Sequence, residues 1–203
     1  MKKILIISIF FFLSSLSTKA DEIKRILVGN KSAKISIIAF ESLTCSHCAN
    51  FHKDVYPLLK KEYLDTGLAK IEFRHFPLDI AAFNASKVAQ CKNDGNVEIL
   101  ESLYANQQKW VKGSSVEEAN INLKKFLSTE GFNIDFESCI NNKQIEDFVL
   151  NDRIDGAKNF KVNATPTIII NNEKFDKTLN YKNLKKALEK LIEVCSWSLK
   201  KSN

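Results

Sequence analysis

Proline and glycine are scarce in this chain of 203 residues, which holds three prolines and six glycines. No stretch is rich in them or in serine, and no segment is repeated, so neither a flexible linker nor a repeat architecture is indicated. A strong charge of one sign is missing as well, because 30 basic residues are mixed with 24 acidic ones. That balance does not favour nucleic acid as a partner.

Long hydrophobic runs are limited to the N-terminus. Lys2 and Lys3 precede an apolar run over residues 4–13, and small residues follow as far as Ala20. This order is typical of a secretory signal peptide at residues 1–20, cleaved after Ala20, and the run is short for a membrane span. We expect an exported, periplasmic protein, with an uncleaved anchor as the alternative. Its net charge would be +3, because the segment removed holds three lysines and no acid.

The first half of the exported chain predicts a βαβ unit. Residues 35–40 are apolar and rich in isoleucine, and residues 70–76 alternate between apolar and polar side chains, so both segments are typical of strands. The apolar spacing between them predicts a helix over about 45–64, which Pro57 should kink. Two strands joined through such a helix are parallel.

The second half predicts a helical block followed by two short strands and a helix. Residues 167–170 read as a strand, 173–175 as its hairpin partner, and 180–199 as an amphipathic helix. The block before them should contain four or five helices, with a break near residues 141–142. These helices are expected at about 80–92, 97–111, 115–129 and 136–160.

A cysteine pair lies where the first predicted strand gives way to the first helix, in the motif Cys45-Ser46-His47-Cys48. Two cysteines at this spacing can bridge, and the first sits where free backbone N–H groups and the helix dipole stabilise a thiolate. Disulfide exchange needs such a thiolate and a second thiol that resolves the mixed disulfide. Cys45 is the candidate nucleophile, Cys48 the buried resolving thiol, and His47 a donor or positive charge beside Cys45. Ser46 completes the candidate catalytic motif.

Thr165 and Pro166 stand at the entry to the third predicted strand. With the cysteine pair and the order of elements, they make the chain resemble the thioredoxin fold. The inserted helical block is similar to that of the DsbA family of exported thiol:disulfide oxidoreductases. The fold this implies is α/β and thioredoxin-like, with an all-helical insertion. The chain then divides into the signal peptide at 1–20, a first half-domain at 21–78, the insertion at 79–160 and a second half-domain at 161–203.

The resemblance also implies roles for residues outside the motif. The peptide bond before Pro166 should be cis, and the backbone of Thr165 should pair with an extended substrate segment. Export makes a disulfide between Cys91 and Cys139 the expected state of these two residues, as in some DsbA relatives, with two separate buried thiols as the alternative. Cys195, on the apolar face of the last helix, is expected to be a core thiol.

The sequence departs from the family pattern at two positions. Ser46 stands where members commonly have proline. Ala39 stands where many members carry an acid six positions before the first cysteine, and Glu41 could substitute on the same strand face. These departures bear on the redox potential more than on the reaction class.

The other two histidines are expected to have structural roles. His52 follows Cys48 by four residues and reads as a helix-surface residue, and His75 in the second strand as a hydrogen-bonded core residue. The two thiolates and the His47 imidazole could also hold zinc or copper. Such a site normally draws on a second pair of ligands, which His52 and His75 are not placed to supply. We therefore expect no metal.

The function indicated is an exported dithiol oxidase that donates the Cys45–Cys48 disulfide to unfolded or reduced exported proteins. By resemblance it would need no cofactor, act as a monomer, and be reoxidised by a quinone-linked membrane partner of the DsbB type. A disulfide isomerase or reductase of the same fold is the first alternative. Isomerases of this kind usually carry an N-terminal dimerisation domain, for which residues 21–34 are too short. A metal- or peptide-binding module with no turnover is the second alternative.

Overall fold

A computed structural model describes residues 22–201, with side chains as far as residue 193. The predicted signal peptide and the side chain of Cys195 therefore lie outside the described residues. Within the described part, no helix combines the length and the apolar character that crossing a membrane requires.

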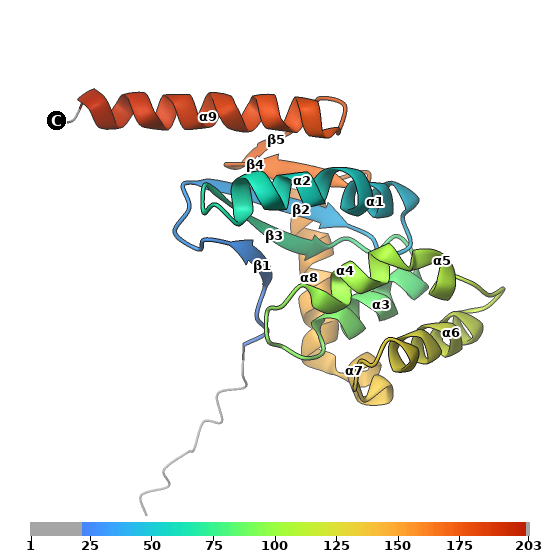
Figure 1. Ribbon diagram of the computed structural model, residues 1–203. Helices are drawn as coiled ribbons and strands as arrows, with labels where there is room; N and C mark the ends of the chain where they lie inside the picture. The colour runs from blue at the N-terminus through green and yellow to red at the C-terminus, as the bar shows by residue number, and fades with distance from the viewer. Residues whose placement is uncertain (1–21, 202–203) are drawn as a thin grey trace, which may run out of the picture.

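A sheet of five strands forms the centre of the molecule (Figure 1). The parallel pairing of β2 with β3 confirms the predicted βαβ unit, and β4 pairs with β2 in antiparallel fashion. The order across the sheet is β1 (Ile26–Gly29), β3 (Ala69–His75), β2 (Ile35–Glu41), β4 (Thr167–Ile170) and β5 (Glu173–Lys174).

The first strand, β1, was not expected from the sequence. It has only four residues, of which Ile26 alone is buried, so it carries no alternation that would identify a strand. It pairs antiparallel with β3. Gly29 ends it at φ +98°, where a Cβ atom would meet the carbonyl oxygen of Ala69 at 2.5 Å. Only glycine allows this close approach between the two strands.

Both faces of the sheet are buried at the central strands β2 and β4. On one face, Ile37 and Ala39 of β2 pack in a core that includes Leu59 and the fully buried Leu184 of the last helix. On the other face, Ile38 and Phe40 pack with Phe76, Val162 and Ile169. The apolar run of residues 35–40 is continuous rather than alternating because neither of its faces meets solvent.

The helix predicted between β2 and β3 is present but irregular. It consists of α1 (Ser46–Asn50), a π-helical turn over Phe51–Val55, α2 (Tyr56–Leu59) and a second π-helical turn over Lys60–Leu64. Pro57 lies at the start of α2 and has no N–H to donate, so the expected distortion takes the form of the wide turns around it.

The predicted helical block contains six helices beside the sheet, and the last of them, α8, runs back to the sheet (Figure 1). The expected break near residues 141–142 is confirmed, because the Asn142 side chain accepts hydrogen bonds from the first N–H groups of α8. Cys91, at the end of α3, forms a disulfide with Cys139 of α7. The six are α3 (Ile80–Gln90), α4 (Glu98–Ala105), α5 (Gln107–Trp110), α6 (Val116–Thr129), α7 (Phe136–Asn141) and α8 (Lys143–Asn159).

The chain then returns to the sheet. Asn171 and Asn172 turn between β4 and β5 with φ of 47° and 70°, as expected for a tight hairpin. The last helix, α9 (Tyr181–Lys201), buries Leu184 and Leu188 completely. These elements confirm the thioredoxin-like fold with a helical insertion.

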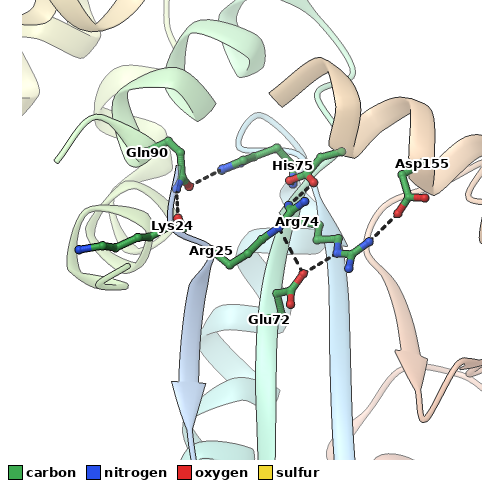
Figure 2. A network of polar contacts seen from close by, with 8 residues as sticks. Lys24, Arg25, Glu72, Arg74, His75, Gln90 and Asp155 are labelled. Atoms are coloured by element: carbon green, nitrogen blue, oxygen red, sulfur yellow. Dashed lines mark hydrogen bonds and ion pairs between the residues drawn. The ribbon is translucent and has the colours of Figure 1, made fainter. Parts of the chain in front are cut away.

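A network of charged and polar groups connects strand β3 and the segment just before β1 to α3 and α8 (Figure 2). Arg74 donates to Asp155, while Arg25 pairs with the buried Asp152. His75 is buried, as expected, and its Nε2 lies 3.1 Å from Oε1 of Gln90. Burial lowers the pKa of His75, so the imidazole is neutral and belongs to the core.

Candidate active site

Cys45 occupies the cap position before α1, with extended backbone and a partly exposed side chain. Its Sγ atom lies 3.4 Å from the carbonyl oxygen of Thr165. The peptide bond between Thr165 and Pro166 is cis. The structure therefore brings the first cysteine of the motif and the loop before β4 together.

The pKa of Cys45 is lowered to about 5. The hydrogen bond with the Cys48 side chain is the largest cause, and the Thr165 side chain and the backbone N–H groups of Cys48 and His47 act in the same direction. Partial burial works against them. The net effect makes Cys45 a thiolate at neutral pH, since donors at a helix start favour the charged form.

Cys48 has the opposite character. Its side chain is completely buried in α1, and loss of solvent raises its pKa. The negative charge of Glu41 raises that pKa further. The pair thus consists of one accessible thiolate and one buried thiol, which is the asymmetry that a nucleophile and a resolving group require.

Ser46 and His47 are both exposed in the first turn of α1. The donor that His47 supplies to Cys45 is its backbone N–H group. His47 therefore contributes to the thiolate through the backbone at the start of the helix.

His52 lies in the interior, and the expectation of a surface position is wrong. It is 9 % exposed, and its Nε2 lies 2.8 Å from Oε2 of the 3 % exposed Glu41. Its ring stacks on Tyr104 at a centroid distance of 4.0 Å. The physical reason is that Cys48, four residues earlier, already faces the core, so the same helical face carries His52 inward.

Gln107 was not identified from the sequence as a site residue. Its Nε2 donates to the carbonyl oxygens of Leu43 and Cys45, at 2.8 and 3.0 Å. A glutamine in a helical stretch carries no signal for such a contact, because the partner lies more than 60 residues away in a backbone loop.

A hollow of about 600 Å³ adjoins Thr165 and Pro166. Its wall mixes apolar and polar groups, and Phe51 is the one aromatic apolar side chain among them. The lining residues are His47, Asn50, Phe51, Asp54, Val55, Thr165, Pro166, Leu179, Asn180 and Tyr181.

Metal binding was weighed as an alternative for the cysteine motif. Among the side chains that the structure describes, no group of three or more histidine, cysteine, aspartate or glutamate residues is arranged to hold a metal ion.

Comparison with known proteins places the chain among thiol–disulfide proteins. A family model described as thioredoxin matches residues 21–190. A putative protein-disulfide oxidoreductase of Rickettsia typhi is 27% identical over 173 residues, which are 82% of this chain and 62% of that protein. Disulfide bond formation protein D of Bacillus subtilis is 25% identical over 178 residues, 82% of this chain and 77% of its own. The chain spans about three fifths of the length of the Rickettsia relative.

A solved structure shows the same arrangement in three dimensions. The crystal structure of Wolbachia pipientis alpha-DsbA1 matches with a TM-score of 0.77 and 28% identity, over 86% of this chain and 94% of that one. The chain is therefore similar to a DsbA protein in both sequence and fold.

Proposed function

Because this chain belongs to the thioredoxin family, we propose that it is an exported thiol:disulfide oxidoreductase that donates its Cys45–Cys48 disulfide to reduced proteins. The observation that carries this proposal is the asymmetry of the pair: the pKa of Cys45 is about 5, beside the buried thiol of Cys48. A structural disulfide has no need of an acidic cysteine at a helix start.

The reaction has two exchange steps. A thiolate of the client attacks the Cys45 sulfur, the Cys45–Cys48 bond breaks, and Cys48 leaves with the electron pair and takes up a proton. A second client thiolate then attacks the client sulfur of the mixed disulfide, and Cys45 leaves as a stable thiolate. The client loses two electrons to this protein, which ends as the dithiol.

The acidity of Cys45 favours this direction. A low pKa makes Cys45 a good leaving group and stabilises the reduced form, so the disulfide is a strong oxidant. The groups that stabilise the thiolate, at the start of α1 and in Thr165, therefore support oxidation of client thiols rather than reduction of client disulfides.

Client binding is proposed at the loop before β4. The Thr165 backbone, which contacts Cys45, would pair with an extended client segment, and the hollow beside Pro166 would take a client side chain. This contact requires no particular amino-acid sequence in the client, because it is made with the client backbone.

The partners follow from this role and from the resemblance to DsbA proteins. The clients would be unfolded or reduced exported proteins in the periplasm. This chain would meet them there after export and cleavage of its own predicted signal peptide. A quinone-linked membrane partner of the DsbB type would restore the disulfide, and no cofactor would be held by this chain, which we expect to act as a monomer.

A disulfide isomerase or reductase is the second candidate function. Ser46, in place of the proline common in DsbA proteins, bears on this alternative because residues between the cysteines adjust the stability of the thiolate and with it the redox potential.

Equilibration in glutathione buffers tests the proposal by measuring the reduction potential of the Cys45–Cys48 pair. A value near that of strong oxidants, about −120 mV, supports a disulfide donor. A value near about −270 mV, at the thioredoxin end, would overturn it in favour of a reductase.

A further inference from the structure

The side chain of Gln107, in the helical insertion, is hydrogen-bonded to two backbone carbonyl groups of the loop that presents Cys45. Both contacts come from Nε2 of Gln107, which lies 2.8 Å from the carbonyl oxygen of Leu43 and 3.0 Å from that of Cys45. The side chain is 8 % exposed, so these bonds are made away from water. Because both hydrogens of one amide are used, the side chain cannot rotate without losing both bonds.

The two carbonyls lie on either side of the turn that leads into the active site. The N–H of Cys45 donates to Ser42 at 3.0 Å, and the carbonyl of Cys45 accepts the first helical bond of α1 from Ala49 at 3.2 Å. Fixing the carbonyls of Leu43 and Cys45 therefore fixes the direction in which the backbone enters α1.

Gln107 is itself held firmly. It begins α5, whose last residue, Trp110, is buried and donates from Nε1 to the carbonyl oxygen of Leu103 at 2.9 Å. The carbonyl of Gln107 accepts from the N–H of Val111 at 2.8 Å. The amide is thus a rigid bridge from the insertion to the cysteine loop.

We propose that Gln107 is a positioning residue: it holds the Cys45 backbone so that the sulfur faces Thr165 and the first N–H groups of α1. This role rests on the proposed function of Cys45 as the exchanging cysteine. Without the amide, two buried carbonyls lose a donor, and the loop must shift to find water or another partner. The shift takes the sulfur away from the groups that stabilise its thiolate.

The test uses Gln107→Met, which keeps the length of the side chain and removes both donors. The reduced protein is titrated with pH, and the thiolate of Cys45 is followed by its absorbance at 240 nm. The expected result is an upward shift of the transition by about one pH unit or more. The matched control is Gln108→Met, a substitution at the exposed neighbour, which should leave the transition in place.

A second readout is the glutathione equilibrium. A rise of about one unit in the pKa of Cys45 should shift the equilibrium with glutathione about tenfold toward the Cys45–Cys48 disulfide at neutral pH. The titratable groups near the cysteine pair, which are Glu41 of β2, His47 of α1 and Tyr104 of α4, are unchanged in every variant.

Gln107→Asn keeps the test decisive if the methionine variant does not fold. It retains the amide but is one methylene shorter, so it cannot reach both carbonyls, and the same shift should appear at a smaller size. A folded Gln107→Met or Gln107→Asn protein with the wild-type transition would overturn the proposal. The titration needs no client, so its outcome is independent of whether the wild-type potential supports an oxidase.

Discussion

The sulfur of Cys45 lies 3.4 Å from the carbonyl oxygen of Thr165, a residue 120 positions further along the chain. The register of the sheet accounts for this contact. β2 and β4 are antiparallel neighbours in which Phe40 lies opposite Thr167, so the loop that leaves β2 emerges beside the loop that enters β4. The pairing of two strands therefore places the thiolate against a backbone edge that a client can reach.

The two cysteines should respond differently to replacement. Cys45→Ala removes the attacked sulfur and should abolish exchange with a reduced client peptide. Cys48→Ala removes the resolving thiol, so Cys45 should accumulate in mixed disulfides with clients. Non-reducing gels and mass spectrometry of the adducts would distinguish the two results.

The matched control for these variants is Cys91→Ala/Cys139→Ala, which changes the same residue type at the distant disulfide and should still exchange. Turnover that persists in Cys45→Ala would refute the assignment of the nucleophile.

In the reduced protein, the reactivity of the Cys45 sulfur should stay constant from pH 9 down to about pH 6 and fall at lower pH, where Cys45 becomes protonated. The reason is that the pKa of Cys45 is about 5 rather than 9.0. Alkylation by iodoacetamide as a function of pH measures this directly, with Cys45→Ala as the blank. A transition near pH 9 would show that the helix start does not stabilise the thiolate.

The same shift predicts a dependence of stability on pH. The folded pKa of Cys45 is lowered, so its contribution to the stability of the reduced protein is fully present above pH 9 and is lost as pH falls through about 5. The free energies of unfolding in urea of the reduced protein and of Cys45→Ser should therefore differ most at high pH and converge near pH 4. Parallel curves across this range would contradict the expectation.

Local patterns in the sequence were sufficient for most of the fold. Each of these patterns depends on only a few consecutive residues. They are the apolar run at 35–40, the alternation at 70–76 and the capping residue Asn142. β1 shows no such pattern, because it has four residues and one buried side chain.

The contacts that complete the site could not be read from the sequence for a different reason. Gln107 and the loop of Cys45 are 62 residues apart, and their bond depends on how the insertion packs against the βαβ unit. Glu41 could be suggested from its strand face, but its partner His52 could be found only by extending the buried face of Cys48 by four residues.

Glu41→Gln should make Cys48 more reactive. The carboxylate of Glu41 raises the pKa of the Cys48 thiol, and glutamine removes the charge while it keeps an acceptor for His52. In a Cys45→Ala background, alkylation of Cys48 at a fixed pH should accelerate by about tenfold, which corresponds to about one pKa unit. Glu137→Gln, at an exposed residue of α7, is the control. A rate that is unchanged or lower would contradict the electrostatic role of Glu41.

The disulfide between Cys91 and Cys139 should stabilise the insertion mainly through the unfolded chain. It closes a loop of 48 residues, which corresponds to about 4 kcal/mol in the chain-entropy model. In a Cys45→Ala/Cys48→Ala background, urea unfolding with and without reductant measures the contribution of the Cys91–Cys139 disulfide alone. Reduction breaks the bridge without replacing any side chain. Reductant should lower the free energy of unfolding by about that amount. Addition of Cys91→Ala/Cys139→Ala should make the protein insensitive to reductant. A loss below about 1 kcal/mol would mean that the unfolded chain is compact even without the bridge.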